Sequence, residues 1–185
     1  QRQMCIRDRI NGSGSHFQSP VCKMFPIGVS ILSPFGSNIE WVKVTNSILN
    51  GPNLNLLGIR QPEIYGNRTL KDLEEMCVNK GQASSINIKF EQSNSESKLV
   101  TSIQDAINTS DGIIINAAGY SHTSVAILDA LNSFSGYVIE VHISDISKRE
   151  EFRRFSYVSL RADYVIMGKG LEGYIEAIEK MLQEG

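Results

Sequence analysis

The chain has 185 residues, of which 41% are hydrophobic and 21% are charged, as is ordinary for a single globular domain. The formal net charge of −2 provides no basic surface for nucleic acid, and no apolar run reaches the roughly 18 residues that span a bilayer. Three cysteines, Cys5, Cys22 and Cys77, form no CxxC pair, which argues against a zinc site or a disulfide framework and favours a reducing, cytoplasmic compartment.

Residues 1–40 lack the pattern of a folded domain. The apolar stretch at 24–35 is interrupted by Pro26 and Pro34. It can be interpreted as the apolar part of a secretory signal, or as a disordered extension, which we favour. The opening letters, QRQMCIRDR, show no periodicity and suggest non-native sequence. We therefore expect an extension over residues 1–40 and one catalytic domain over residues 41–185.

From about Val44 onward, short β-like runs alternate with runs of helical period. Strands are expected at 47–50, 86–90, 111–116, 137–144 and 164–167, and helices near 70–77, 99–107, 123–134, 148–156 and 174–182. The first strand, with Thr45 and Asn46 beside it, is more polar than a central strand should be. Five β-α units in strict alternation predict an α/β fold with an open parallel sheet covered on both faces. Five strands favour the flavodoxin-like doubly wound order in a single domain.

Ligands of such sheets bind beyond the carboxyl ends of the strands, so the loops that follow the strands are the candidate site. These loops carry more polar side chains than turns alone require. They contain both histidines outside the first 40 residues. The candidates in these loops are Asn53, Arg60, Tyr65, Asn116, His122 and His142.

The EVHIS run supports a catalytic interpretation of one histidine. Side chains alternate across a strand, so Glu140, His142 and Ser144 share a face. A carboxylate two residues from an imidazole can fix its tautomer and raise its basicity, which makes His142 a credible general acid. The alternative is a hydrogen-bonded histidine that caps a strand.

Tyr65 lies near the end of a segment rich in Gly and Pro, NGPNLNLLGIRQPEIYG. A tyrosine with a pKa of about 10 is a poor base at pH 7, and lowering that pKa by roughly 3 units takes about 4 kcal/mol. One or two arginines such as Arg60 could supply this stabilisation. Gly58, Pro62 and Gly66 would let the loop close as a lid. A surface tyrosine beside a turn is the alternative interpretation.

Three further segments have simpler explanations than ligand binding. GKGLEG, at 168–173, satisfies GxGxxG but follows the last strand, so a glycine turn at a helix N-terminus is favoured over a nucleotide site. SNSES, at 93–97, could cradle phosphate, although Ser95 or Asn94 is expected to cap the next helix. KREEFRR usually forms a solvated helical face, from which Arg153 could clamp an anion or a hydroxyl group.

Taken together, these segments resemble a known family. The chain from about Lys43 to Leu182 is similar to type II 3-dehydroquinate dehydratase. Five blocks carry the likeness in family order and at family spacing: LNGPNLNLLGIRQPEIYG, FEQSNSES, INAAGYSHTSVAILDAL, EVHISDISKREEFRRFSYVS and GKGLEGY.

The resemblance implies reversible dehydration of 3-dehydroquinate to 3-dehydroshikimate through an enolate, without a metal or cofactor. It implies a homo-oligomer, usually trimers gathered into a dodecamer, and no nucleic-acid or membrane partner. The implied catalytic residues are Tyr65 as base, Arg60 and Arg153 stabilising its phenolate, Asn53 acting on the enolate through a water, and His142 as the acid oriented by Glu140. The implied substrate-binding residues are Asn116, Ile143 and Ser144 for the carboxylate, His122 and Arg153 for hydroxyl groups, and Asp129 for the neighbouring subunit's site.

The chain departs from the family pattern at three positions. Ala118 replaces a usual glycine and could crowd the carboxylate loop, Leu128 replaces a common arginine, and Asp145 replaces the usual asparagine. Leu128 and Asp145 motivate one alternative, a catalytically decayed oligomer. A second alternative is a non-catalytic flavodoxin-like module that binds an anion or nucleotide through SNSES and GKGLEG.

Overall fold

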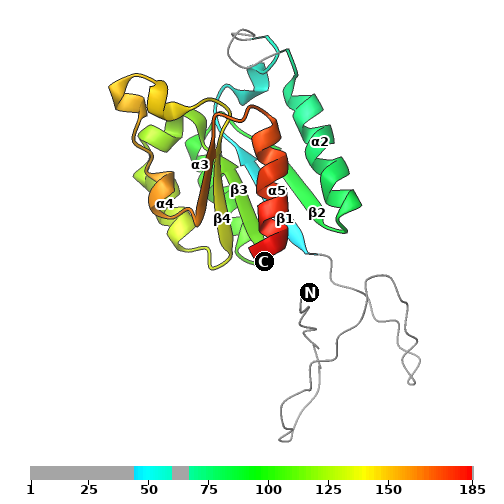
Figure 1. Ribbon diagram of the computed structural model, residues 1–185. Helices are drawn as coiled ribbons and strands as arrows, with labels where there is room; N and C mark the ends of the chain where they lie inside the picture. The colour runs from blue at the N-terminus through cyan, green and yellow to red at the C-terminus, as the bar shows by residue number, and fades with distance from the viewer. Residues whose placement is uncertain (1–43, 60–66, 185) are drawn as a thin grey trace, which may run out of the picture. The chain divides into compact units, whose positions relative to one another are not determined.

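The computed structural model describes residues 44–59 and 67–184 (Figure 1). Five parallel strands form a sheet in the order β2-β1-β3-β4-β5. This is the doubly wound order that the sequence predicts, and that prediction is confirmed. The strands are β1 (Thr45–Asn50), β2 (Asn87–Gln92), β3 (Gly112–Asn116), β4 (Tyr137–His142) and β5 (Tyr164–Met167).

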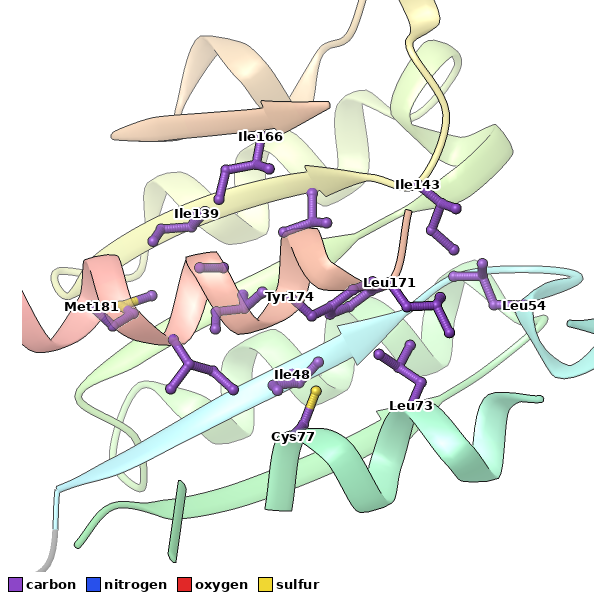
Figure 2. Close-up of a cluster of buried hydrophobic side chains, with 14 of the residues drawn as sticks. Ile48, Leu54, Leu73, Cys77, Ile139, Ile143, Ile166, Leu171, Tyr174 and Met181 are labelled. Carbon is purple, nitrogen blue, oxygen red and sulfur yellow. The ribbon is translucent and has the colours of Figure 1, made fainter. Parts of the chain in front are cut away.

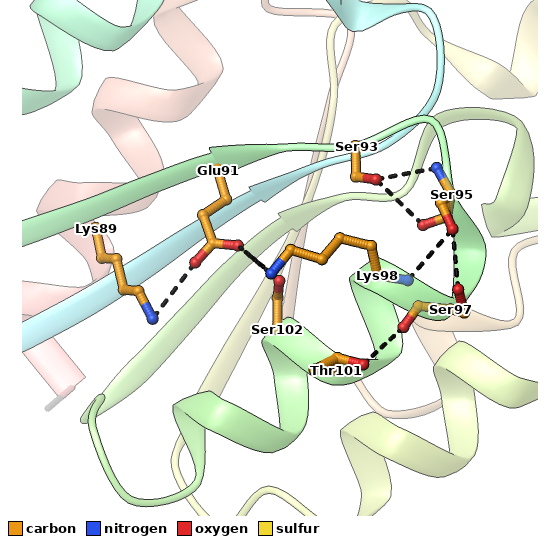
Figure 3. Close-up of polar contacts among 8 residues, drawn as sticks. All are labelled: Lys89, Glu91, Ser93, Ser95, Ser97, Lys98, Thr101 and Ser102. Carbon is orange, nitrogen blue, oxygen red and sulfur yellow. Dashed lines mark hydrogen bonds and ion pairs between the residues drawn. The ribbon is translucent and has the colours of Figure 1, made fainter.

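Helices cover both faces of the sheet, two on each (Figure 1). Helices α2 (Leu70–Ala83) and α5 (Glu172–Glu184) enclose one core with the sheet, part of which is drawn in Figure 2. Helices α3 (Glu96–Ala106) and α4 (Val125–Asn132) enclose the other. Because side chains alternate along a strand, Ile48 and Leu49 of β1 enter opposite cores. Ser95 is the N-cap of α3, as predicted (Figure 3).

The inner strand β1, between β2 and β3, is more polar than its position suggests, and several of its polar groups are paired. Asn46 and Ser47 are almost completely buried. The Ser47 hydroxyl lies 2.7 Å from the Ser110 hydroxyl, and the Thr45 amide donates to Asp111 Oδ2 at 2.8 Å. Since a buried polar group is costly only when it lacks a partner, these contacts let a polar sequence occupy the centre of the sheet.

The prediction of a helix near residues 148–156 is wrong. The connection between β4 and β5 contains three short 3₁₀ turns instead: η3 (Ile146–Lys148), η4 (Glu151–Arg153) and η5 (Val158–Leu160). Phe152 and Phe155, the large apolar residues of this run, are 71% and 52% exposed. A helix gains most of its stability from packing an apolar face, and this run buries none against the described core.

The GKGLEG segment is a turn, and it supports the end of β4. Gly168 and Gly170 have φ angles of 75° and 59°, a region that glycine enters without steric cost. Their amides donate to the carbonyls of His142 at 3.1 Å and Ile143 at 3.0 Å. Strand β4 ends at His142, two residues before the predicted boundary, so Ile143 begins the loop that these glycines hold.

Candidate active site

A cavity of about 190 Å³ lies at the carboxyl ends of β1, β3 and β4. The described part of its lining contains two arginines and two histidines and no carboxylate, so its chemistry favours an anion. The lining residues are Pro52, Asn53, Leu54, Leu56, Leu57, Asn116, Ala118, Gly119, His122, His142, Ile143, Ser144, Ile146, Arg149 and Arg153.

One wall of the cavity begins where β1 and β3 end side by side. The Gly51 amide donates to the Asn116 carbonyl at 2.8 Å, and a Cβ atom on Gly51 would lie 2.4 Å from the Ala117 carbonyl oxygen. Only glycine fits here. Asn53 follows with a φ of 66°, and its amide donates to Asn94 Oδ1 at 2.9 Å. Asn94, predicted as a possible cap, therefore ties the loop after β1 to the loop after β2.

Asn116 is held by a buried chain of hydrogen bonds. Its Nδ2 donates to the Tyr174 hydroxyl at 2.9 Å, and that hydroxyl donates to Asn50 Oδ1 at 2.7 Å. Its Oδ1 accepts from the Ala118 amide at 3.2 Å. These contacts distinguish the nitrogen of the Asn116 side-chain amide from its oxygen and so fix the orientation of the amide. Burial raises the pKa of the Tyr174 phenol, so Tyr174 is a neutral bridging group at pH 7 and not a base.

Ala118 has a φ of 51°, in the left-handed region that a side chain disfavours. Relief of this strain outweighs the added flexibility of the unfolded chain, so Ala118→Gly is expected to raise the free energy of unfolding by about 0.5–1 kcal/mol. Thermal unfolding measures this, with Ala117→Gly as the matched control. Ala117 has a φ of −72° and is fully buried, so its replacement should lower Tm. Equal losses of Tm in both variants would contradict the expectation.

His142 is paired with a buried carboxylate. Its Nε2 lies 2.8 Å from Glu140 Oε1, and the two side chains are 5% and 0% exposed. The carboxylate also accepts from the Ser156 hydroxyl at 2.6 Å and from the Ser159 hydroxyl. Burial acts to raise the pKa of Glu140, but His142 and the two hydroxyl groups outweigh it and hold that pKa below its usual value. The 2.8 Å contact is an ion-pair distance and does not meet hydrogen-bond geometry at Nε2. Because an ionised carboxylate only accepts, Glu140 favours a proton on Nε2, which leaves Nδ1 for a ligand.

His122 lies beside His142, with the rings stacked 6.4 Å apart at 11°. Its Nδ1 is 2.7 Å from the Phe155 carbonyl oxygen, and because a carbonyl only accepts, Nδ1 carries a proton. Arg153 Nε is 3.5 Å from Glu150 Oε2, and its guanidinium lies 5.3 Å from the Phe152 ring centre. Both side chains reach the cavity from loops, as their positions after β3 and β4 predict.

The structure brings most of the predicted site residues together. Those that line the cavity are Asn53, Asn116, His122, His142, Ile143, Ser144 and Arg153, with Glu140 directly behind His142. Asp129 is exposed on α4 and is not part of this lining. Tyr65 and Arg60 lie outside the described residues, so the proposed base and its activator are not placed. Asp145 is the N-cap of η3, where Ser147 and Lys148 bind its carboxylate.

Sequence reasoning missed four residues of this site. Arg149 lines the cavity and its Nη1 lies 3.5 Å from the Ser144 hydroxyl. Ser156 ends the run that is predicted as a helix, and Ser159 lies three residues beyond that run. Tyr174 was assigned only to an apolar helix face. No periodic pattern in the sequence marks Ser156 or Ser159, because the tertiary path of the segment brings both to Glu140.

Among the described residues, no group of three or more His, Cys, Asp and Glu side chains could hold a metal ion. Within the same ranges, no helix has both the length and the apolar character needed to cross a membrane.

Comparison with known proteins points to one family. Residues 44–182 match Dehydroquinase class II. The chain is 56% identical over 134 residues to 3-dehydroquinate dehydratase of Cereibacter sphaeroides, covering 72% of this chain and 91% of the relative. It is 59% identical over 135 residues to that of Streptomyces avermitilis, covering 72% and 85%.

The type II dehydroquinase from Butyrivibrio crossotus has a similar solved structure, with a TM-score of 0.74 and 43% identity over 76% of this chain and 98% of that chain. The match extends over every described strand and helix, and over the cavity that they build. The chain therefore belongs to the class II dehydroquinase family.

Proposed function

We propose that this protein is a 3-dehydroquinate dehydratase, a hydro-lyase that removes water reversibly from 3-dehydroquinate to give 3-dehydroshikimate. One observation carries the proposal: the Glu140–His142 pair, at 2.8 Å, adjoins a cavity whose described lining is cationic and lacks carboxylates. Such a cavity suits a carboxylate substrate, and the pair supplies a positioned proton donor. Family membership and the named relatives support the same activity.

The first chemical step is removal of a proton α to the ketone. Tyr65, as phenolate, takes this proton, and the electron pair of the broken C–H bond forms an enolate. Preorganised donors at the enolate oxygen are commonly the largest catalytic contribution. Asn53 is placed at the cavity, where it can act through a water molecule. Arg60 and Arg153 stabilise the phenolate, and Arg149 adds a second described guanidinium to the cavity lining.

The second step is loss of the β-hydroxyl. The enolate electrons re-form the ketone and a carbon–carbon double bond as the C–O bond breaks. His142 gives its proton to the departing hydroxyl, so that water leaves and the imidazole becomes neutral. The buried Glu140 carboxylate lies 2.8 Å from the imidazole and orients it for this transfer.

Substrate binding is assigned to the remaining lining residues. Asn116 uses one N–H for Tyr174, and its second N–H is available to the substrate carboxylate. Ser144 and the backbone amide of Ile143 complete that carboxylate site at the end of β4. His122 and Arg153 bind ring hydroxyl groups. Asp129, exposed on α4, reaches the site of a neighbouring subunit.

The proposed assembly is a trimer-based homo-oligomer, a dodecamer in full. Large apolar side chains are exposed on the described surface, and a partner subunit would cover them: Phe152, Leu160, Phe155 and Val125 are 71%, 64%, 52% and 50% exposed. We also assign the catalytic domain to residues 41–185, an extension to residues 1–40, and the protein to the cytoplasm. The family match over 44–182 supports the domain boundary.

Adding 3-dehydroquinate to the purified protein tests the proposal. The product is a conjugated enone, so turnover appears as a rise in ultraviolet absorbance. Binding of a nucleotide without turnover would instead support the non-catalytic module. A correctly assembled oligomer without turnover would support a decayed enzyme.

A further inference from the structure

We propose that Ser156 and Ser159 are positioning residues that keep the Glu140 carboxylate fixed and charged, so that it holds His142 in its working orientation. The inference rests on the proposed function, because it concerns the same proton donor. Neither serine lines the cavity, so both act through Glu140.

The contacts around Glu140 account for both of its oxygens. Oε1 accepts from the Ser156 hydroxyl at 2.6 Å and lies 2.8 Å from His142 Nε2, while Oε2 accepts from the Ser159 hydroxyl. Glu140 is 0% exposed and Ser156 is 5% exposed. A carboxylate removed from water stays ionised only where donors replace its hydration. The imidazole of His142 contacts only Oε1, and the two serine hydroxyl groups supply the further donors to Oε1 and Oε2.

The fold explains why two serines meet one carboxylate. Ser159 lies in η5, Ser156 lies two residues before η5 begins, and both hydroxyl groups donate to Glu140. The Ser156 hydroxyl also accepts from the Ser159 amide at 3.4 Å. The neighbouring Phe155 carbonyl binds His122 Nδ1. One short segment, 155–159, thus sets both imidazoles of the cavity.

Loss of the hydroxyl groups would change the contact between His142 Nε2 and the Glu140 carboxylate. A protonated Glu140 can donate its own proton to Nε2, and this moves the imidazole proton to Nδ1 and reverses the tautomer. It also removes the negative charge that lies beside the His142 ring. The enzyme would then lose activity at a pH where the parent protein still works.

The test compares pH profiles of kcat in Ser156→Ala and Ser159→Ala. We expect the acid limb of each profile to move upward by about one pH unit, because Glu140 gains a proton more readily. Ser159→Thr keeps a hydroxyl group and is expected to retain the original limb. Ser102→Ala is the matched control, since the Ser102 hydroxyl donates to the Glu91 carboxylate at 2.6 Å on another part of the fold (Figure 3). Its profile should not move.

A second readout does not depend on turnover. The ¹³Cε1 NMR signal of His142 is assigned by its loss in His142→Asn. Protonation of the neighbouring Glu140 at low pH should shift this signal, and we expect the inflection of that shift to lie at higher pH in both alanine variants. Upward movement of this inflection in a protein without turnover would support the positioning role while rejecting the proposed function. An unmoved inflection and an unmoved acid limb, with only a lower Tm, would overturn the inference. Should Ser156→Ala fail to fold, Ser159→Ala decides, because Ser159 is only half-buried.

Discussion

Replacing His142 with Asn is expected to lower kcat on the order of 10³-fold while KM changes little. The asparagine can fill part of the space and donate a hydrogen bond, but it cannot give up a proton to the departing hydroxyl. The loss should therefore fall on the chemical step. Steady-state kinetics with 3-dehydroquinate measures both constants.

The matched control for His142→Asn is His122→Asn, because the two rings stack in the same cavity. His122 is assigned to substrate hydroxyls, so its replacement should raise KM more than it lowers kcat. Thermal unfolding of both variants separates misfolding from lost chemistry. A kcat in His142→Asn within about tenfold of the parent value would exclude this residue as the general acid.

Tyr65→Phe is expected to reduce kcat by a similar factor, on the order of 10³-fold or more. The substitution removes one hydroxyl group and leaves the ring, so the cavity keeps its shape while the base is lost. Exchange of the substrate's α-proton with deuterated water, followed by NMR, isolates this first step. We expect Tyr65→Phe to abolish the exchange.

His142→Asn provides the contrast in the same experiment, because it leaves the base intact. That variant is expected to exchange the α-proton while failing to release water. Exchange that persists at the parent rate in Tyr65→Phe would assign the base to another group. Tyr174 is not that group, because burial raises the pKa of its phenol and both of its hydrogen-bond partners are amides in the core.

The sheet and its site edge were predictable because they follow from local periodicity and a topological rule. The apolar run at 112–115 is typical of a buried parallel strand, and a polar residue at the end of such a strand, Asn116, is expected at the edge where ligands bind. The alternation in EVHIS placed Glu140 and His142 on one face, and the 2.8 Å contact confirms that geometry.

The segment after β4 was not predictable in the same way. The charged residues of this segment match the pattern of a solvated helical face, but tertiary contacts fix the path of its backbone. The Tyr157 amide donates to the Ser121 carbonyl at 2.8 Å, and the Ser156 and Ser159 hydroxyl groups donate to Glu140. Such contacts join residues far apart in the chain and leave no periodic signal. The same limit hid Tyr174, whose hydroxyl serves Asn50 and Asn116 while its ring sits in an ordinary apolar position.

The hydrogen-bond chain through Tyr174 makes helix α5 a support of Asn116, the residue proposed to bind the substrate carboxylate. A truncated chain that stopped short of this helix would expose one face of the sheet, and it would also release the Asn116 amide to rotate. Removal of α5 as a whole is therefore an intervention at the carboxylate pocket, although this helix lies far from Asn116 in the sequence.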